Sequence, residues 1–231
     1  GEISHENELI EVIDCKKENQ LIIHKVKKLP QEITSEFTAK VNKRYRKNIS
    51  RNHSATHLLH ESLRDILGIH VEQKGSLVDS KHLRFDFTHF RKIDDHIIKK
   101  IESHVNNKIL SNIELIEHKE ILLTEAKSMG AIMLFSEKYE EKVRMIQFGS
   151  SIELCGGTHV KSTAEIGPFK ILSEGSVASG IRRIEACTGE VTLDYFNYKV
   201  NLVDELSTIL KSKDVRSTVD NLIARNKQLE K

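Results

Sequence analysis

The chain has 231 residues, with 36 Lys and Arg against 34 Asp and Glu and a formal net charge of +2 at pH 7. This length allows one large domain or two small ones, and the balanced charge produces no overall field that points to a nucleic-acid partner. The three cysteines are odd in number and widely spaced, which excludes a disulfide framework and favours a reducing, cytoplasmic location. No apolar run is long enough to span a membrane, and the first residues lack both Met and a signal-peptide pattern, so we expect a processed chain or a fragment.

The first part of the chain, residues 1–47, is predicted to be a small β module. Residues 9–13 and 20–26 have the composition of strands, residues 16–19 are expected to form the turn between them, and residues 34–41 alternate as a third strand. A module this short is not expected to be stable alone.

A basic run follows the module, with no acidic residue between Lys40 and Arg51. A solvated connector is the simpler interpretation for so short a run. The functional alternative is a surface that contacts phosphates, and its position just before a pair of histidines supports that alternative. The residues predicted to contact nucleic acid are Lys43, Arg44, Arg46 and Lys47.

A helix is predicted from about Ser50 or Asn52 to Leu67, with Gly68 as its C-terminal stop. His53 and His57 lie four residues apart, so their side chains project from one face of this helix and could bind the same ion. His60 lies on the same stripe and could be a third ligand from the helix, although we expect it beside the ligands or at the surface. The His-Glu-x-x-His pattern of zinc proteases is absent, which disfavours a metalloprotease.

A hairpin is predicted next, from residues 71–78 and 82–88 with a turn at residues 79–81. Gly75 lies inside its first strand between Gln73 and Ser76, which indicates a bulge or the close approach of a ligand. A plain solvent-exposed face is the alternative.

The remaining predicted elements alternate between helices and strands. Helices are expected at residues 93–110 and 123–129, and strands at residues 113–120, 131–135, 143–148, 169–173 and 180–187. Arg182 and Arg183 are adjacent in the last strand, so at most one should point into a site. From residue 190 the pattern becomes helical, with a break near residues 212–214.

Cys155 and His159 form a second pair with three residues between them, two of which are Gly156 and Gly157. Glycines let the backbone turn sharply, and thiolate with imidazole is a ligand combination that zinc accepts. With 12 histidines in the chain, chance pairs are expected, and either pair alone would be weak evidence. The two pairs together favour one shared zinc site formed by His53, His57, Cys155 and His159.

Five segments of the chain resemble, in order and spacing, the editing domain of alanyl-tRNA synthetases. They are residues 51–60 (RNHSATHLLH), 73–78 (QKGSLV), 83–87 (LRFDF), 155–159 (CGGTH) and 180–186 (GIRRIEA). The resemblance covers nearly the whole chain. Free-standing alanyl editing proteins and the editing domain of threonyl-tRNA synthetase are related to this family.

The resemblance implies an α+β fold, with a mixed, largely antiparallel sheet and helices around a zinc site. Residues 1–47 would be the end of a β-barrel segment, residues 48–189 the editing domain, and residues 190–231 a helical linker. The aminoacylation core, with its ATP-binding site, would lie upstream and a C-terminal domain downstream. The activity implied is hydrolysis of tRNA(Ala) wrongly charged with serine or glycine.

The resemblance also implies roles for individual residues. The zinc ligands match His53, His57, Cys155 and His159, and Gln73 matches a residue that the family needs for editing. We expect Gln73 and Cys155 to be catalytic. The residues expected to contact the substrate are Thr56, Ser76, Gly156, Gly157 and either or both of Arg182 and Arg183.

Three questions stay open at this point. Zinc could activate water or only orient the substrate, because four protein ligands are typical of a structural site. The protein could be a free-standing editing enzyme, or a zinc-stabilised tRNA-binding module without turnover. A homo-oligomer is possible.

Overall fold

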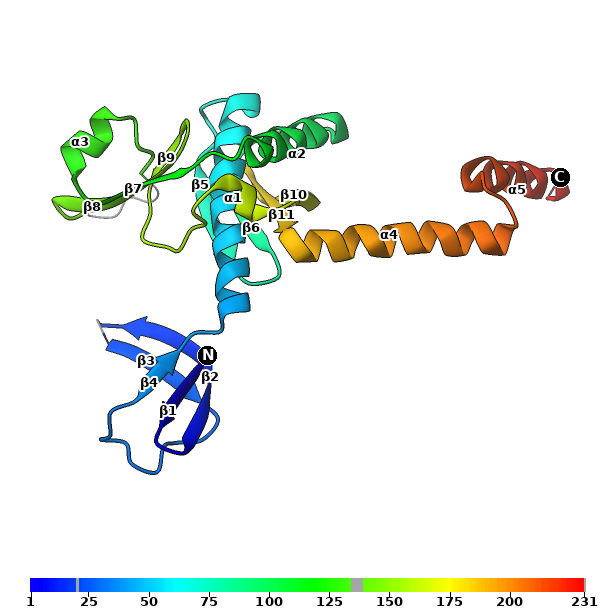
Figure 1. Ribbon diagram of the computed structural model, residues 1–231. Helices are drawn as coiled ribbons and strands as arrows, with labels where there is room; N and C mark the ends of the chain where they lie inside the picture. Colours follow the sequence, from blue (N-terminus) through cyan, green and yellow to red (C-terminus); the bar gives the residue numbers. More distant parts are fainter. Residues whose placement is uncertain (20, 134–138, 231) are drawn as a thin grey trace.

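Two separate regions precede and follow the body of the protein in the computed structural model, which describes residues 1–19, 21–133 and 139–230 (Figure 1). The first is an antiparallel sheet with the strand order β3-β2-β1-β4. Its strands are β1 (Glu2–His5), β2 (Glu8–Glu18), β3 (Leu21–Val26) and β4 (Thr38–Lys40). The predicted strands at residues 9–13 and 20–26 overlap β2 and β3, whereas of the predicted strand at residues 34–41 only Thr38–Lys40 is formed, and the following helix already begins at Lys43.

The prediction was wrong in two details of this sheet. Strand β1 was not foreseen, and residues 16–18 are not in a turn, because β2 continues to Glu18 and the chain turns at Asn19 with φ of 46°. These residues are exposed on a two-stranded ribbon, where charged side chains remain in water, so a polar composition does not end the strand.

Helix α1 (Lys43–Leu67) is the central element of the body. It begins well before the predicted start near Ser50, because the Asn42 side chain accepts a hydrogen bond from the Tyr45 N–H at 3.1 Å and so caps the first turn. The early turns are solvent-exposed and lack an apolar stripe, which hid them from periodicity. Gly68 ends the helix as predicted, its N–H bonded to the Arg64 carbonyl at 2.9 Å.

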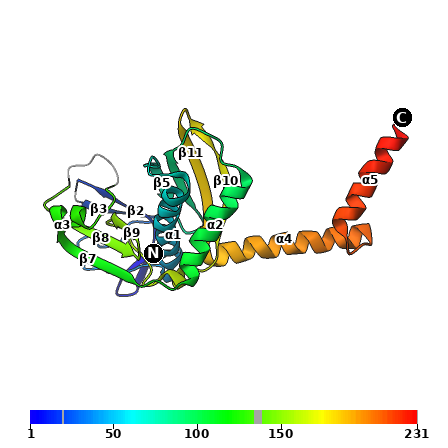
Figure 2. The same cartoon turned by 90° about the horizontal axis from the view of Figure 1, so that it is seen from above.

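The main sheet is antiparallel with the order β10-β11-β6-β5, and α1 and α2 pack on one of its faces (Figures 1 and 2). The elements are β5 (Gln73–Val78), β6 (Leu83–Thr88), α2 (Asp95–Leu110), β10 (Phe169–Ala178) and β11 (Ile181–Thr188). Fully buried Leu59, Phe85 and Ile184 belong to the common core. The register shifts between Gln73 and Gly75, which confirms the predicted bulge.

A smaller antiparallel sheet, β7-β8-β9, lies on the other side of α1 (Figure 1). Its parts are β7 (Leu115–Leu122), α3 (Leu123–Ser128), β8 (Lys142–Phe148) and β9 (Ser151–Leu154); η1 (Thr163–Ile166) follows and packs on α1 and α2. Of the strand predicted at residues 131–135, only a bridge between Ile132 and Glu153 is formed, and residues 134 and 135 lie outside the described residues. The α+β class with antiparallel sheets is confirmed.

A helical arm leaves the body after β11. It consists of α4 (Gly189–Leu210) and α5 (Val215–Leu229), separated near the predicted break, where Lys211 is left-handed with φ of 49°. Figure 2 shows α4 extending away from the sheets. Among the described residues, no helix is long and apolar enough to cross a membrane.

Asn52 joins α1 to the main sheet just before the paired histidines. Its side-chain amide donates to the Asp79 carbonyl at 2.9 Å and accepts from the Thr188 hydroxyl at 2.7 Å. The bond to Thr188 is buried and the bond to Asp79 is partly buried, and together they fix the helix against the β5–β6 turn and the end of β11.

Asn52→Ala should lower the free energy of unfolding by about 1–3 kcal/mol, because it removes two hydrogen bonds and leaves the buried Thr188 hydroxyl without this acceptor. Urea unfolding followed by circular dichroism measures this. The exposed Asn107→Ala on α2 is the control, and we expect it to change the free energy by less than about 0.5 kcal/mol. Equal effects of the two substitutions would contradict the role given to Asn52.

Candidate metal centre

The structure brings the two predicted halves of the metal site together. His53 and His57 project from one face of α1, and Cys155 and His159 belong to the loop that follows β9. One donor atom from each of the four lies within 4.8 Å of the others. The Cys155 Sγ is 3.5 Å from His53 Nε2 and 3.3 Å from His159 Nε2.

These separations fit a zinc ion. Tetrahedral zinc, with Zn–S of about 2.3 Å and Zn–N of about 2.0 Å, places sulfur and nitrogen ligands about 3.5 Å apart. The donor set also fits, since one thiolate with three imidazoles suits zinc better than magnesium or calcium, which prefer oxygen ligands. The four residues therefore form a group that can hold a metal ion, and zinc is the ion that its chemistry favours.

Burial keeps the three imidazoles in the neutral form that a metal requires. It lowers the pKa of His57 to about 3 and that of His159 to about 2, and it also lowers the pKa of His53. Burial raises the pKa of the Cys155 thiol. A bound cation would have to displace that proton, so metal binding and deprotonation of Cys155 are coupled.

The imidazole nitrogens that face away from the shared centre meet other parts of the chain. His159 Nδ1 lies 3.1 Å from the Ser54 hydroxyl, which also accepts the Val160 N–H at 3.1 Å. His57 Nδ1 lies 3.4 Å from a carboxylate oxygen of Glu153. Such contacts orient a ring and select the nitrogen that remains available to the ion.

The two glycines of the loop have different surroundings. A Cβ on Gly157 would lie 2.1 Å from His53 Cε1 and 2.4 Å from Nδ1, so only glycine leaves room for this imidazole. A Cβ on Gly156 would meet nothing within 4 Å, and Gly156 lines the adjacent pocket. Gly157 therefore packs on His53, one of the four donor residues, which the sequence did not reveal; a contact of either glycine with substrate stays a prediction.

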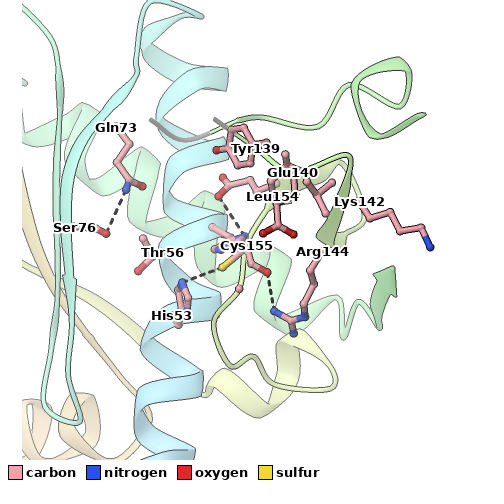
Figure 3. Close-up of a pocket in the computed structure, with 14 residues that line it drawn as sticks. His53, Thr56, Gln73, Ser76, Tyr139, Glu140, Lys142, Arg144, Leu154 and Cys155 are labelled. Carbon is pink, nitrogen blue, oxygen red and sulfur yellow. Dashed lines mark hydrogen bonds and ion pairs between the residues drawn. The ribbon is translucent and has the colours of Figure 1, made fainter. Parts of the chain in front are cut away.

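Arg144 holds this loop in place from strand β8. Its guanidinium donates to the Cys155 carbonyl at 2.7 Å (Figure 3). It also donates to the Gly157 carbonyl and to Glu117, both at 2.7 Å. The arginine lies within a strand among apolar residues, and nothing in the sequence distinguished it. Because one side chain fixes two carbonyls on either side of Gly156, the ligand loop has a defined position relative to the small sheet.

A pocket of about 460 Å³ opens beside the four donors (Figure 3). Gln73 and Ser76 of β5 lie across it from Cys155, and the Gln73 amide donates to the Ser76 hydroxyl at 3.3 Å. The Thr56 hydroxyl donates to the Asn52 carbonyl at 2.9 Å and keeps its acceptor capacity. The wall also contains residues that sequence analysis did not select: Tyr139, Glu140, Lys142, Val143, Arg144, Glu153 and Leu154.

Arg182 and Arg183 do not line this pocket. Arg182 forms a two-point ion pair with Glu174, and Arg183 forms one with Asp86 at 2.7 Å for each of its two contacts. Each guanidinium is thus engaged by a carboxylate of its own sheet, which explains why neither reaches the site. A contact of either arginine with substrate stays a prediction, and it would have to be made outside the residues that line this pocket.

The basic residues predicted to contact nucleic acid form the first turns of α1. All four, Lys43, Arg44, Arg46 and Lys47, are exposed, and Arg44 pairs with Glu190 of α4 at 3.0 Å. They lie on the same helix as His53, so their distance from the metal group is fixed.

Comparisons with known proteins agree with the resemblance. Residues 143–185 match the family described as "Threonyl and Alanyl tRNA synthetase second additional domain". The chain is 51% identical over 226 residues to the alanine–tRNA ligase of Flavobacterium psychrophilum. The aligned residues make up 96% of this chain and 26% of that relative. The chain is 50% identical over 230 residues to the alanine–tRNA ligase of Christiangramia forsetii, with 99% and 26% covered. The chain therefore spans about a quarter of the length of these curated relatives.

The two glycines give a matched test of the centre. Gly157→Ala should displace His53, because its Cβ would overlap the ring, and should lower the zinc bound per chain or its affinity by at least about tenfold, since one of four ligands is disturbed. Gly156→Ala should bind zinc like the unaltered chain. Zinc content and competition with a chromophoric chelator measure both variants. Equal affinities would show that His53 is not a ligand.

Proposed function

We propose that this chain, which is homologous over nearly its whole length to a segment of alanine–tRNA ligases, is the editing part of such an enzyme. It would hydrolyse the ester of tRNA(Ala) mischarged with serine or glycine. One observation carries the proposal: three of the four donor residues, His53, His57 and Cys155, line a pocket whose opposite wall presents polar groups of β5. A metal group that served only to stabilise the fold would need no such opening.

The polar wall suits an aminoacyl group with a hydroxyl. Gln73, Ser76 and Thr56 offer amide and hydroxyl groups within one pocket, so they can hydrogen-bond a serine side chain. A site built to bond a hydroxyl discriminates strongly against a substrate that lacks it, which would protect alanine from hydrolysis. Glycine would be admitted by its size.

The chemistry is divided between the metal and the chain. A zinc ion held by His53, His57, Cys155 and His159 would act as a Lewis acid on the ester or on the attacking water. Gln73 would orient the acyl group from across the pocket. Arg144 would hold the Cys155 loop, and with it the thiolate, in a fixed position relative to the substrate. A ribose hydroxyl of the substrate could accept the proton.

The start of α1 is positioned to hold the nucleic acid. Arg46 is seven residues before His53, which is two helical turns or roughly 10 Å along the axis. The helix N-terminus adds its own partial positive charge to the basic side chains there. A tRNA end bound with its phosphates on this helix would place its terminal ribose towards the pocket.

There are two alternatives: in one the metal only stabilises the fold, and in the other the chain is a separate editing protein and not part of a synthetase. Four protein donors are typical of structural zinc, and this observation favours a zinc-stabilised tRNA-binding module without turnover. A free-standing editing protein is the second alternative. The helical arm formed by α4 and α5 supports a place within a larger synthetase, as a link to a further domain.

The proposed setting follows from the same homology. The other partners would be the aminoacylation core with its ATP site and a C-terminal domain, all within one protein of protein biosynthesis, and a homo-oligomer is possible. The described cysteines, Cys15, Cys155 and Cys187, are free thiols, which is consistent with a cytoplasmic location.

Hydrolysis of Ser-tRNA(Ala) and Ala-tRNA(Ala) by the chain and by Cys155→Ala tests the proposal. We expect rapid loss of serine, sparing of alanine, and at least about a hundredfold slower hydrolysis by the variant, because the metal loses its thiolate. The folded state is checked by circular dichroism and tRNA binding by filter retention. A variant that unfolds and loses tRNA would instead support a structural zinc module.

The role of the basic helix start is tested through salt dependence. Replacing Arg46 and Lys47 by Gln should weaken tRNA binding and lower the slope of log K against log salt by about 1.4–1.8, or 0.7–0.9 for each lost phosphate contact. The matched control replaces Lys99 and Lys100, which are exposed on α2, by Gln. Equal slopes for the two double variants would exclude α1 as the phosphate-binding surface.

A further inference from the structure

A buried carboxylate lies between the metal group and the core. Glu153 is in strand β9, two residues before Cys155, and only 2% of its surface is exposed. Its two oxygens face two imidazoles of α1: Oε2 lies 3.4 Å from Nδ1 of His57, and Oε1 lies 2.8 Å from Nδ1 of His60. The carboxylate therefore hydrogen-bonds His60 and lies beside His57, a candidate metal ligand one helical turn earlier, whose Nδ1 has no hydrogen-bond partner among the described residues.

His60 itself is not a ligand. It is 1% exposed, stands outside the four-donor group, and packs on Phe85 with 5.2 Å between ring centroids. Since a carboxylate only accepts, the 2.8 Å contact fixes the proton of His60 on Nδ1. Among the described residues no partner reaches its Nε2. Within the described ranges, the hydrogen bond to Glu153 is therefore the one polar side-chain contact of the His60 ring.

Burying an ionised carboxylate such as that of Glu153 is costly unless partners of opposite charge or hydrogen-bond donors stabilise it. The described lysines and arginines form no ion pair with Glu153, and its charged-group contacts are His57 and His60. A metal ion behind His57 would supply the missing positive charge. The imidazole Nδ1–H would then point at Oε2 and leave Nε2 for the ion.

We propose that Glu153, held in place by His60, is a positioning residue that sets the ring orientation of His57 as a metal ligand. This inference rests on the metal binding proposed above and extends the site into the core beyond its four ligands. The chain Phe85–His60–Glu153–His57 ties the metal to the main sheet. Cys155 begins the loop directly after β9, two residues beyond Glu153, so the carboxylate and the thiol are close neighbours in the chain.

Zinc affinity of the 231-residue chain is the direct test, measured by competition with a chromophoric chelator. Glu153→Gln keeps the shape and removes the charge, and we expect about a 10–100-fold loss of affinity. The matched control is Glu61→Gln, another buried carboxylate of this region, which contacts Lys108 and Ser150 and no metal ligand. The control should bind zinc within about twofold of the unaltered chain, whatever its stability.

Substitution of His60 separates positioning from general packing. His60→Leu removes the donor and should weaken zinc binding in the same direction as Glu153→Gln. His60→Asn retains an N–H at the place of Nδ1 and should restore most of the affinity. Absorption spectra of the cobalt(II)-loaded proteins should shift with Glu153→Gln and His60→Leu and not with Glu61→Gln, because they report ligand geometry.

The possible results are distinct. Unchanged zinc affinity and cobalt spectrum in Glu153→Gln would overturn the proposal, and if that variant does not fold, equal affinities for His60→Leu and His60→Asn would overturn it. An unaltered chain that binds no zinc would overturn this proposal together with the metal site. Zinc bound tightly without any deacylation would contradict the editing function alone and leave the positioning role standing.

Discussion

The packing of α1 between two sheets is the constraint on which the rest of the structure depends. One side of the helix presents buried leucines to the main sheet, and a neighbouring stripe presents His53 and His57 to the loop after β9. Because both stripes belong to one rigid helix, the core fixes the position of two of the four donor residues. Asn52 strengthens this link, since it ties the helix to the turn of β5–β6 and to the end of β11.

The other half of the site depends on interactions that hold a loop against this helix. Arg144 donates hydrogen bonds to the carbonyls on both sides of Gly156. Gly157 leaves space for the His53 ring. The Ser54 hydroxyl of α1 lies within hydrogen-bond distance of His159 Nδ1. A metal ion would complete this arrangement, because it would balance the charge of the Cys155 thiolate and link the helix to the loop. The pocket then acquires one wall from each half, with β5 opposite the ligands.

Sequence reasoning found the parts of this site that use distinctive residues at a regular spacing. The paired histidines and the Cys-Gly-Gly-Thr-His motif predicted the donor group, and Gly75 predicted the bulge in β5. It missed what depends on tertiary neighbours. Arg144 and Glu153 occupy ordinary strand positions, and only the fold shows what they face. Arg182 and Arg183 looked like site residues in the sequence. In the fold each forms an ion pair with a carboxylate of the main sheet, Arg182 with Glu174 and Arg183 with Asp86. The early start of α1 was not predicted, because its first turns are exposed and basic and therefore lack the periodic apolar residues that indicate a helix.

The central claim is that the metal group and the pocket form one hydrolytic site for mischarged tRNA(Ala). Removing zinc with a chelator, assaying Ser-tRNA(Ala) hydrolysis, and then restoring zinc tests it most directly. We expect hydrolysis to stop when zinc is removed, while tRNA binding continues, and to return with about one zinc per chain. Hydrolysis that persists at full rate in zinc-free, folded protein would contradict this claim.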